Sequence, residues 1–175
     1  SATNLSSSTV NSGAETFLVG LLQSFSAVSP SIESFVLGDR TSLARLGIAQ
    51  PIVQVDGNAG LRRVLRDYRR IGEIAAANGA GALIYPHEWC PKSAIPVVGV
   101  LQNVGWLDRR SRDSFGLRGS LLRRQTRLTA SGFAHFVCVS QSAYDIWEEV
   151  GYGRGVSVSV IPESVDIQRA RSCTR

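Results

Sequence analysis

The stretch "HFVCVSQSAYDIWEEVGYGRGVSVSVIP" (residues 135–162) decides the fold class. Its first part, "HFVCVS" (135–140), is short and apolar, which is typical of a buried strand. The segment "SAYDIWEEV" (142–150) has the composition of a helix, and Ser142 is predicted to be its N-cap. The run "VSVSVI" (156–161) predicts the next strand. A strand, a helix and a strand in this succession predict two parallel strands joined by a helical crossover.

The same alternation continues toward the N-terminus. About ten residues separate the strands that end at Tyr85 and begin at Pro96, whereas a parallel crossover usually needs about a dozen or more. An irregular loop is therefore predicted at this joint. The whole pattern predicts an α/β protein with a mostly parallel sheet and helices on both faces. Helices are predicted from Ala14, from Leu61 to Ala75 and over 114–131; strands are predicted over 34–39, 51–56, 82–85 and 96–101, with a faint first strand in 1–12.

Composition narrows the class of protein. The chain has 175 residues, 43% of them hydrophobic and 19% charged, which is ordinary for a single globular domain. It contains neither an apolar run of about 20 residues nor a signal-peptide pattern, so a cytoplasmic location is expected. Cys90, Cys138 and Cys173 have no CxxC spacing, so no metal site is predicted, and Cys138 is expected to be a small buried apolar residue.

The net charge of +5 has two interpretations. Lys92 is the only lysine among 19 basic residues, a bias that either reflects genome composition or attracts anionic partners. No nucleic-acid motif is present, so nucleic acid is not expected as a partner. The helix predicted over 114–131 has arginines beside leucines. Such a helix can lie on the inner face of an anionic membrane, but more often its leucines pack on the sheet and its arginines are solvated.

Ligands of open α/β sheets bind beyond the carboxyl ends of the strands, and four loops there carry polar residues. Gly13 enters the first helix, where backbone N–H groups can approach an anion, although a plain turn is an alternative. Asp39 could contact the ribose of a nicotinamide cofactor, but no GxGxxG motif accompanies it. His87 follows a buried strand and suits proton transfer or hydrogen bonding to a sugar, unless it is a loop residue without a role. Gln102 and Asn103 follow the next strand, where they could bind a polyhydroxylated ligand or cap the loop.

Several segments together resemble the N-terminal domain of family-4 retaining glycosyltransferases. The resemblance spans about residues 11–167, and its order and spacing are more specific than any one motif. It rests on "SGAETFLVGLL" (12–22), "ALIYPHEW" (82–89), "IPVVGVLQN" (95–103) and "AHFVCVSQSAYDIWEEVGYGRGVSVSVIPESVDI" (134–167).

This resemblance implies a Rossmann-like three-layer sandwich that forms one half of a GT-B architecture. In that family the N-terminal domain binds the acceptor and a second domain binds the nucleotide-sugar donor, generally without a metal or another cofactor. It implies that His87 contacts the sugar at the reaction centre, and that Ser12, Gly13, Glu88, Gln102 and Asn103 bind substrate. Residues 1–167 would form the acceptor domain, and residues 168–175 would be a disordered tail or the start of the interdomain linker.

The chain also departs from the family pattern. Ser12 stands where a second glycine is usual, Gln102 and Asn103 replace a histidine, and "ES" (163–164) replaces Asn-Gly. The donor domain is absent, so the isolated chain is expected not to transfer sugar without a donor-domain partner. The alternatives are a non-catalytic glycan-binding or scaffold module and, less favoured, a nicotinamide-dependent oxidoreductase domain.

Overall fold

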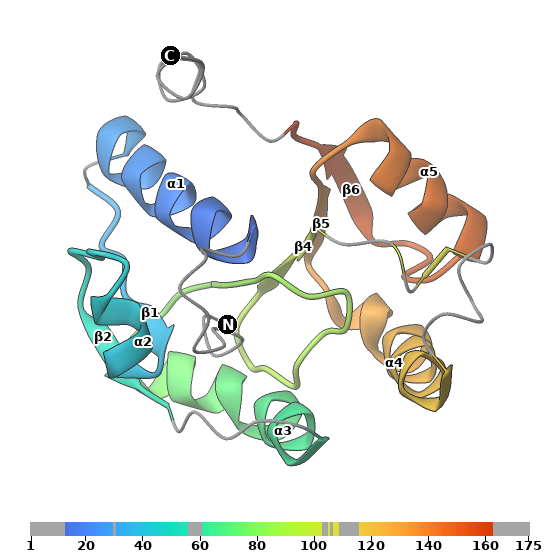
Figure 1. Cartoon of the computed structure of the whole chain (residues 1–175), viewed down its shortest axis with the longest axis horizontal. Helices are drawn as coiled ribbons and strands as arrows, with labels where there is room; N and C mark the ends of the chain where they lie inside the picture. The colour runs from blue at the N-terminus through green and yellow to red at the C-terminus, as the bar shows by residue number, and fades with distance from the viewer. Residues whose placement is uncertain are drawn as a thin grey trace, which may run out of the picture.

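The computed structural model describes residues 13–29, 31–55, 61–102, 105, 107–108 and 116–162. It confirms the α/β class, with helices and parallel strands alternating along most of the chain (Figure 1). The faint first strand predicted in 1–12 lies outside the described residues. In chain order the elements are α1 (Gly13–Val28), β1 (Val36–Gly38), α2 (Arg40–Ala44), β2 (Ile52–Gln54), α3 (Leu61–Ala77), β3 (Leu83–Tyr85), β4 (Val97–Leu101), α4 (Gly116–Thr129), the 3-10 turn η3 (Ala130–Gly132), β5 (His135–Cys138), α5 (Gln141–Val150) and β6 (Ser157–Val160).

The described strands pair in parallel, as predicted, and they form two sheets. β1 pairs with β2 in one sheet, and the other sheet has the order β3-β4-β5-β6. Within the larger sheet Val98 is opposite His135, and Phe136 is opposite Val158. The carboxyl ends of β3 to β6 therefore lie along one edge of the sheet.

The joint between β3 and β4 contains no helix, which confirms the predicted irregular loop. Two hydrogen bonds donated by backbone N–H groups of this loop hold it against neighbouring helices. The Lys92 N–H donates to the Tyr68 carbonyl of α3 at 2.7 Å, and the Cys90 N–H donates to the Thr129 hydroxyl of α4 at 3.1 Å. The loop thus packs on the helical layer and takes the place of a crossover helix.

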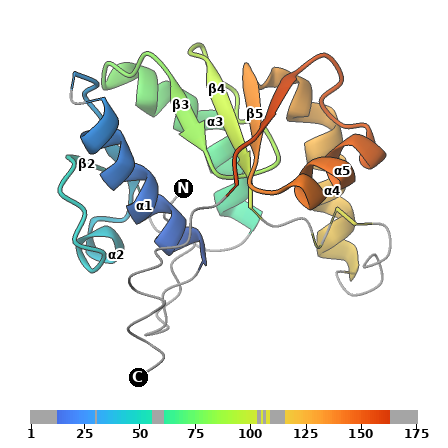
Figure 2. The ribbon, with the colours of Figure 1, turned by 90° about the horizontal axis from the view of Figure 1, so that it is seen from above.

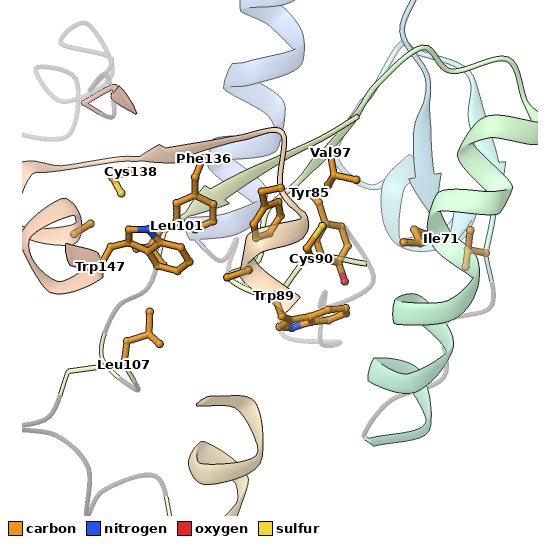
Figure 3. Packing of buried hydrophobic residues seen from close by; sticks show 14 residues of the cluster. Ile71, Tyr85, Trp89, Cys90, Val97, Leu101, Leu107, Phe136, Cys138 and Trp147 are labelled. Carbon is orange, nitrogen blue, oxygen red and sulfur yellow. The ribbon is translucent and has the colours of Figure 1, made fainter. Parts of the chain in front are cut away.

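The main core lies between the four-stranded sheet and the helices α3, α4 and α5. One buried cluster includes Ile71 of α3, Phe136 of β5, Trp147 of α5 and Leu107, with Ile71 at one end of the cluster and Trp147 at the other (Figure 3). α1 lies on the opposite side of the strands from α3, and the two views agree on this (Figures 1 and 2). Helix, sheet and helix are three layers, which is compatible with a Rossmann-like fold.

Aromatic stacking forms the centre of this core. The rings of Phe136 and Trp147 are 4.0 Å apart between centroids and nearly parallel, and Phe133 is 5.1 Å from Phe136. Gly99 on β4 provides the space for both phenylalanines, because a Cβ atom there would lie 2.7 Å from Phe133 Cε1 and closer still to the Phe136 ring. A larger residue in place of Gly99 would therefore overlap the two phenylalanine rings where β4 pairs with β5.

A smaller cluster joins β1 to the short helix α2, which the sequence pattern did not predict. Leu43 of α2 is fully buried against Leu22 of α1 and Val36 of β1. Leu22 belongs to the apolar stripe that predicted α1. The five residues of α2 are too few to show a helical period, so only tertiary packing reveals the helix.

The predicted N-cap of α5 is wrong by two residues. Ser140 is the N-cap, and its hydroxyl accepts a hydrogen bond from the Ala143 N–H at 3.1 Å. Ser142 lies inside the helix and is exposed. Both serines satisfy the rule for N-caps, and the end of β5 at Cys138 decides between them, because the cap residue must keep an extended backbone.

The prediction that the leucines of α4 pack on the sheet is wrong for three of the four. Leu122 packs against the core, whereas Leu117, Leu121 and Leu128 are 86%, 55% and 69% exposed. At about 100° per residue these three share one face of the helix. The buried positions of α4 include Thr126, on the opposite face. The helix therefore presents a leucine stripe, Leu117–Leu121–Leu128, to the outside.

Candidate functional site

The candidate site lies at the carboxyl edge of β3 and β4, where the chain leaves two neighbouring parallel strands. His87 follows β3 by two residues, and Gln102 directly follows β4. Tyr85 pairs with Gly99, so both strands deliver these polar side chains to the same edge of the sheet. The sequence predicted this convergence for His87 and Gln102, and parallel pairing of β3 with β4 is the reason for it.

The ring of His87 is held in an aromatic stack. Its centroid is 5.4 Å from that of Trp89, with only 17° between the ring planes, and 5.0 Å from that of Tyr85. Tyr85 and Trp89 contact each other edge to face, and both are buried (Figure 3). A short turn in which the His87 N–H donates to the Tyr85 carbonyl at 2.8 Å brings the three rings together. The imidazole is therefore fixed in orientation while it remains half-buried.

Sequence reasoning missed the roles of Tyr85 and Trp89. The available signal is the spacing Tyr85-x-His87-x-Trp89, which places three rings within five residues at the end of a strand. The stack gives His87 an apolar support, which restricts its rotamers and would reduce the entropy lost when a ligand binds.

Gln102 is half-buried, and its amide nitrogen Nε2 is buried with no hydrogen-bond partner among the described residues. A buried amide without a partner costs about 1–3 kcal/mol. A ligand that offers a hydroxyl or carbonyl oxygen at this position would satisfy the amide. Gln102 is thus the residue of this site with an unused donor.

Glu88 is 8% exposed, so its carboxylate has little access to solvent beside His87. Cys90 follows two residues later, and burial raises the pKa of its thiol to about 11. Because the thiol is the form present near neutral pH, Cys90 is not an activated nucleophile. Cys138 at the end of β5 is fully buried, as expected, and burial with the nearby Glu148 charge raises its pKa to about 11 as well.

The remaining predicted residues are only partly described. Gly13 is the first residue of α1, which agrees with its predicted position at a helix N-terminus. Ser12 and Asn103 lie outside the described residues. Asp39 contacts Gln54, whose Nε2 donates to the Asp39 carboxylate at 3.4 Å. His135 begins β5 at the opposite edge of the sheet, where its ring bonds to the hydroxyls of Ser157 and Ser159.

Among the described residues, no group of three or more histidine, cysteine or acidic side chains could hold a metal ion. Comparisons with protein families, with curated proteins and with solved structures found no match for the chain.

Proposed function

We propose that the chain binds a sugar-containing acceptor at the carboxyl edge of β3 and β4, as the acceptor half of a retaining sugar transferase. The observations that carry the proposal are the stacked His87 and the unsatisfied amide of Gln102, which follow two neighbouring strands at the same edge of the sheet. Sugars present many hydroxyl groups, which donate to an imidazole nitrogen and accept from an amide N–H. The resemblance to family-4 glycosyltransferases supports the same edge of the sheet as the acceptor site.

In this proposal the main contribution of the protein is to position the two substrates, and covalent chemistry by its side chains contributes less. His87 contacts the sugar at the reacting carbon, and Gln102 with Asn103 holds acceptor hydroxyls. The donor would be a nucleotide sugar bound mainly by a donor-domain partner, which would also stabilise the departing diphosphate. Holding two substrates in a reactive geometry accounts for a large share of the rate enhancement in such reactions.

Replacing His87 with alanine is expected to weaken the binding of sugar probes at least tenfold, because both the hydrogen bond and the ring that covers Trp89 are lost. Binding of free hexoses and hexose phosphates can be followed by NMR titration of backbone amides, with shifts expected at residues 86–90 and 102. His135→Gln is the matched control, since His135 is the other histidine and lies at the opposite edge of the sheet. Unchanged affinity of the His87→Ala variant, or shifts confined to other residues, would contradict the proposed function.

A second candidate function is a non-catalytic glycan-binding module, and the aromatic rings around His87 favour it, because such rings are sufficient to support a bound sugar. A module needs hydrogen-bonding groups for the sugar but no acid or base beside His87. The coding sequence around this chain distinguishes the two functions. A neighbouring region that encodes a second Rossmann-like domain with a Glu-x7-Glu spacing supports the transferase, and its absence supports the module.

We also propose that α4 contacts an anionic membrane surface through the leucine stripe. Arg124 lies on the same face as the stripe, so its positive charge would meet lipid phosphates while the leucines enter the interface. Among the described residues, no helix is long and apolar enough to cross a membrane. The proposed contact is therefore peripheral.

Replacing Leu117, Leu121 and Leu128 with glutamine is expected to reduce binding to phosphatidylglycerol vesicles at least tenfold in a co-sedimentation assay. The control replaces three other exposed apolar residues, Val28, Ile32 and Ile161, with glutamine. If instead the leucine variant abolishes self-association or binding of a protein partner and leaves vesicle binding unchanged, the stripe is a protein interface and the membrane proposal is wrong.

A further inference from the structure

A cavity lies near the amino ends of β5 and β6, and none of its lining residues belongs to the candidate acceptor site. Its volume is about 600 Å³, and it is bordered by α4, η3 and the turn 151–155 between α5 and β6. Because η3 precedes β5 and the turn precedes β6, the cavity lies near the amino ends of these strands. It is therefore separate from the candidate acceptor site at the carboxyl ends.

The cavity is strongly basic. Arg123 and Arg127 of α4 line one side and Arg154 of the turn lines another, and none of the described lining residues is acidic. Each guanidinium presents N–H donors in a planar fork that matches the oxygens of a phosphate group.

A hydrogen bond within α4 and the packing of the turn 151–155 restrain the segments that carry the basic side chains. Arg123 Nη2 donates to the Ser120 hydroxyl at 3.1 Å, which orients the guanidinium along the helix. The turn that carries Arg154 packs on the core through Gly153, where a Cβ atom would lie 2.9 Å from Trp147 Cζ2. Gly151 ends α5 in the left-handed conformation, with a φ of 65°. Such restraint lowers the conformational entropy that a ligand must overcome on binding.

The remaining lining residues indicate how large the ligand is. Tyr152 and Leu107 provide an apolar wall, and Ser131 adds a hydroxyl. A volume of about 600 Å³ falls within the usual range for small-molecule sites and exceeds the needs of a lone inorganic phosphate. The ligand class that fits is a phosphate group attached to an organic body.

We propose that the cavity lined by Arg123, Arg127 and Arg154 is a binding site for an organic phosphate. The phosphate is held by the arginines, and the organic part lies against Tyr152 and Leu107. A soluble phosphorylated metabolite and the headgroup of a phospholipid share this chemistry. The site stands independently of the proposed acceptor function, because the two sites share none of their residues.

The test measures binding of glycerol 3-phosphate and inositol hexakisphosphate by calorimetry, and of phosphatidylglycerol vesicles by co-sedimentation. The double variant Arg127→Ala/Arg154→Ala is expected to bind at least tenfold more weakly than the unmodified chain. The matched control is Arg69→Ala/Arg70→Ala, which removes the same charge from exposed positions of α3. The variant Arg127→Lys/Arg154→Lys is expected to lie between the two, because lysine keeps the charge and loses the fork geometry.

Binding of the soluble probes alone identifies a free phosphorylated metabolite as the ligand. Vesicle binding that the cavity variant weakens, and that the replacement of Leu117, Leu121 and Leu128 with glutamine leaves unchanged, identifies a lipid headgroup. Amide shifts in the titration are expected at residues 123–131 and 151–154, not at 86–90. Equal weakening by the cavity variant and the α3 variant would show general attraction between charges and overturn the proposal. Failure of every probe to bind the unmodified chain would also overturn it.

Discussion

Replacing Trp147 with alanine is expected to lower the free energy of unfolding by about 3–5 kcal/mol, the range for removal of a large buried aromatic side chain. Trp147 is 1% exposed and stacks on Phe136 at 4.0 Å. It also contacts the turn 151–155 at Gly153, so its loss would leave a cavity between the sheet, η3 and the turn. Urea denaturation followed by circular dichroism measures the change.

The control for this prediction is Trp147→Phe, which keeps an aromatic ring on Phe136. It is expected to cost less than half as much, because a smaller cavity remains. If the two variants lose equal stability, the stack does not dominate the packing of α5. A well-folded alanine variant with unchanged stability would mean that α5 does not pack on the sheet as described.

The second large effect is expected for Gly72→Ala in α3. A Cβ atom at this position would lie 2.6 Å from Ser93 Cβ and 2.8 Å from Ser93 Cα, and closer still to the Lys92 carbonyl oxygen. Backbone atoms cannot rotate away, so the helix and the β3–β4 loop must separate. A loss of about 1–3 kcal/mol or more is expected from such overpacking, measured by the same denaturation.

Gly20→Ala in α1 is the matched control. Gly20 is exposed, and no atom lies within 4 Å of the added Cβ. This substitution is expected to stabilise the protein by about 0.5–1 kcal/mol, because alanine favours the helix over glycine. The Gly72 variant should also alter the NMR signals of residues 86–90, because the displaced loop carries His87. Unaltered signals together with unaltered stability would contradict the close approach of α3 to this loop.

Periodicity and turn residues predicted the order of the strands and the main helices, because the long helices repeat an apolar face and the strands are short apolar runs next to turn residues. The β3–β4 joint was predicted from length alone, because a parallel connection of about ten residues has no room for a helix. The same reasoning located His87 and Gln102 at one edge, because parallel strands align their carboxyl ends.

The hydrophobic pattern of the sequence could not predict features that depend on tertiary packing. Leu122 and Leu121 are adjacent in the sequence, yet one packs on the core and the other faces outward. The helical period alone cannot choose which of two apolar faces is covered. The cavity lined by arginines could not be predicted for a related reason. Arg154 is about thirty residues from Arg123 in the sequence, and only the turn after α5 brings the two residues together.

The strand order β3-β4-β5-β6 has a consequence for the folding of the four-stranded sheet. Each strand after β3 pairs with the strand made immediately before it. During synthesis on a ribosome, each of these strands therefore emerges after the strand with which it pairs, and none of the four described strands must be inserted between two others. Pairings close in sequence favour rapid folding. We infer that this sheet grows by addition at one edge, and that Trp147 holds α5, the helix before the last strand, on Phe136 of β5.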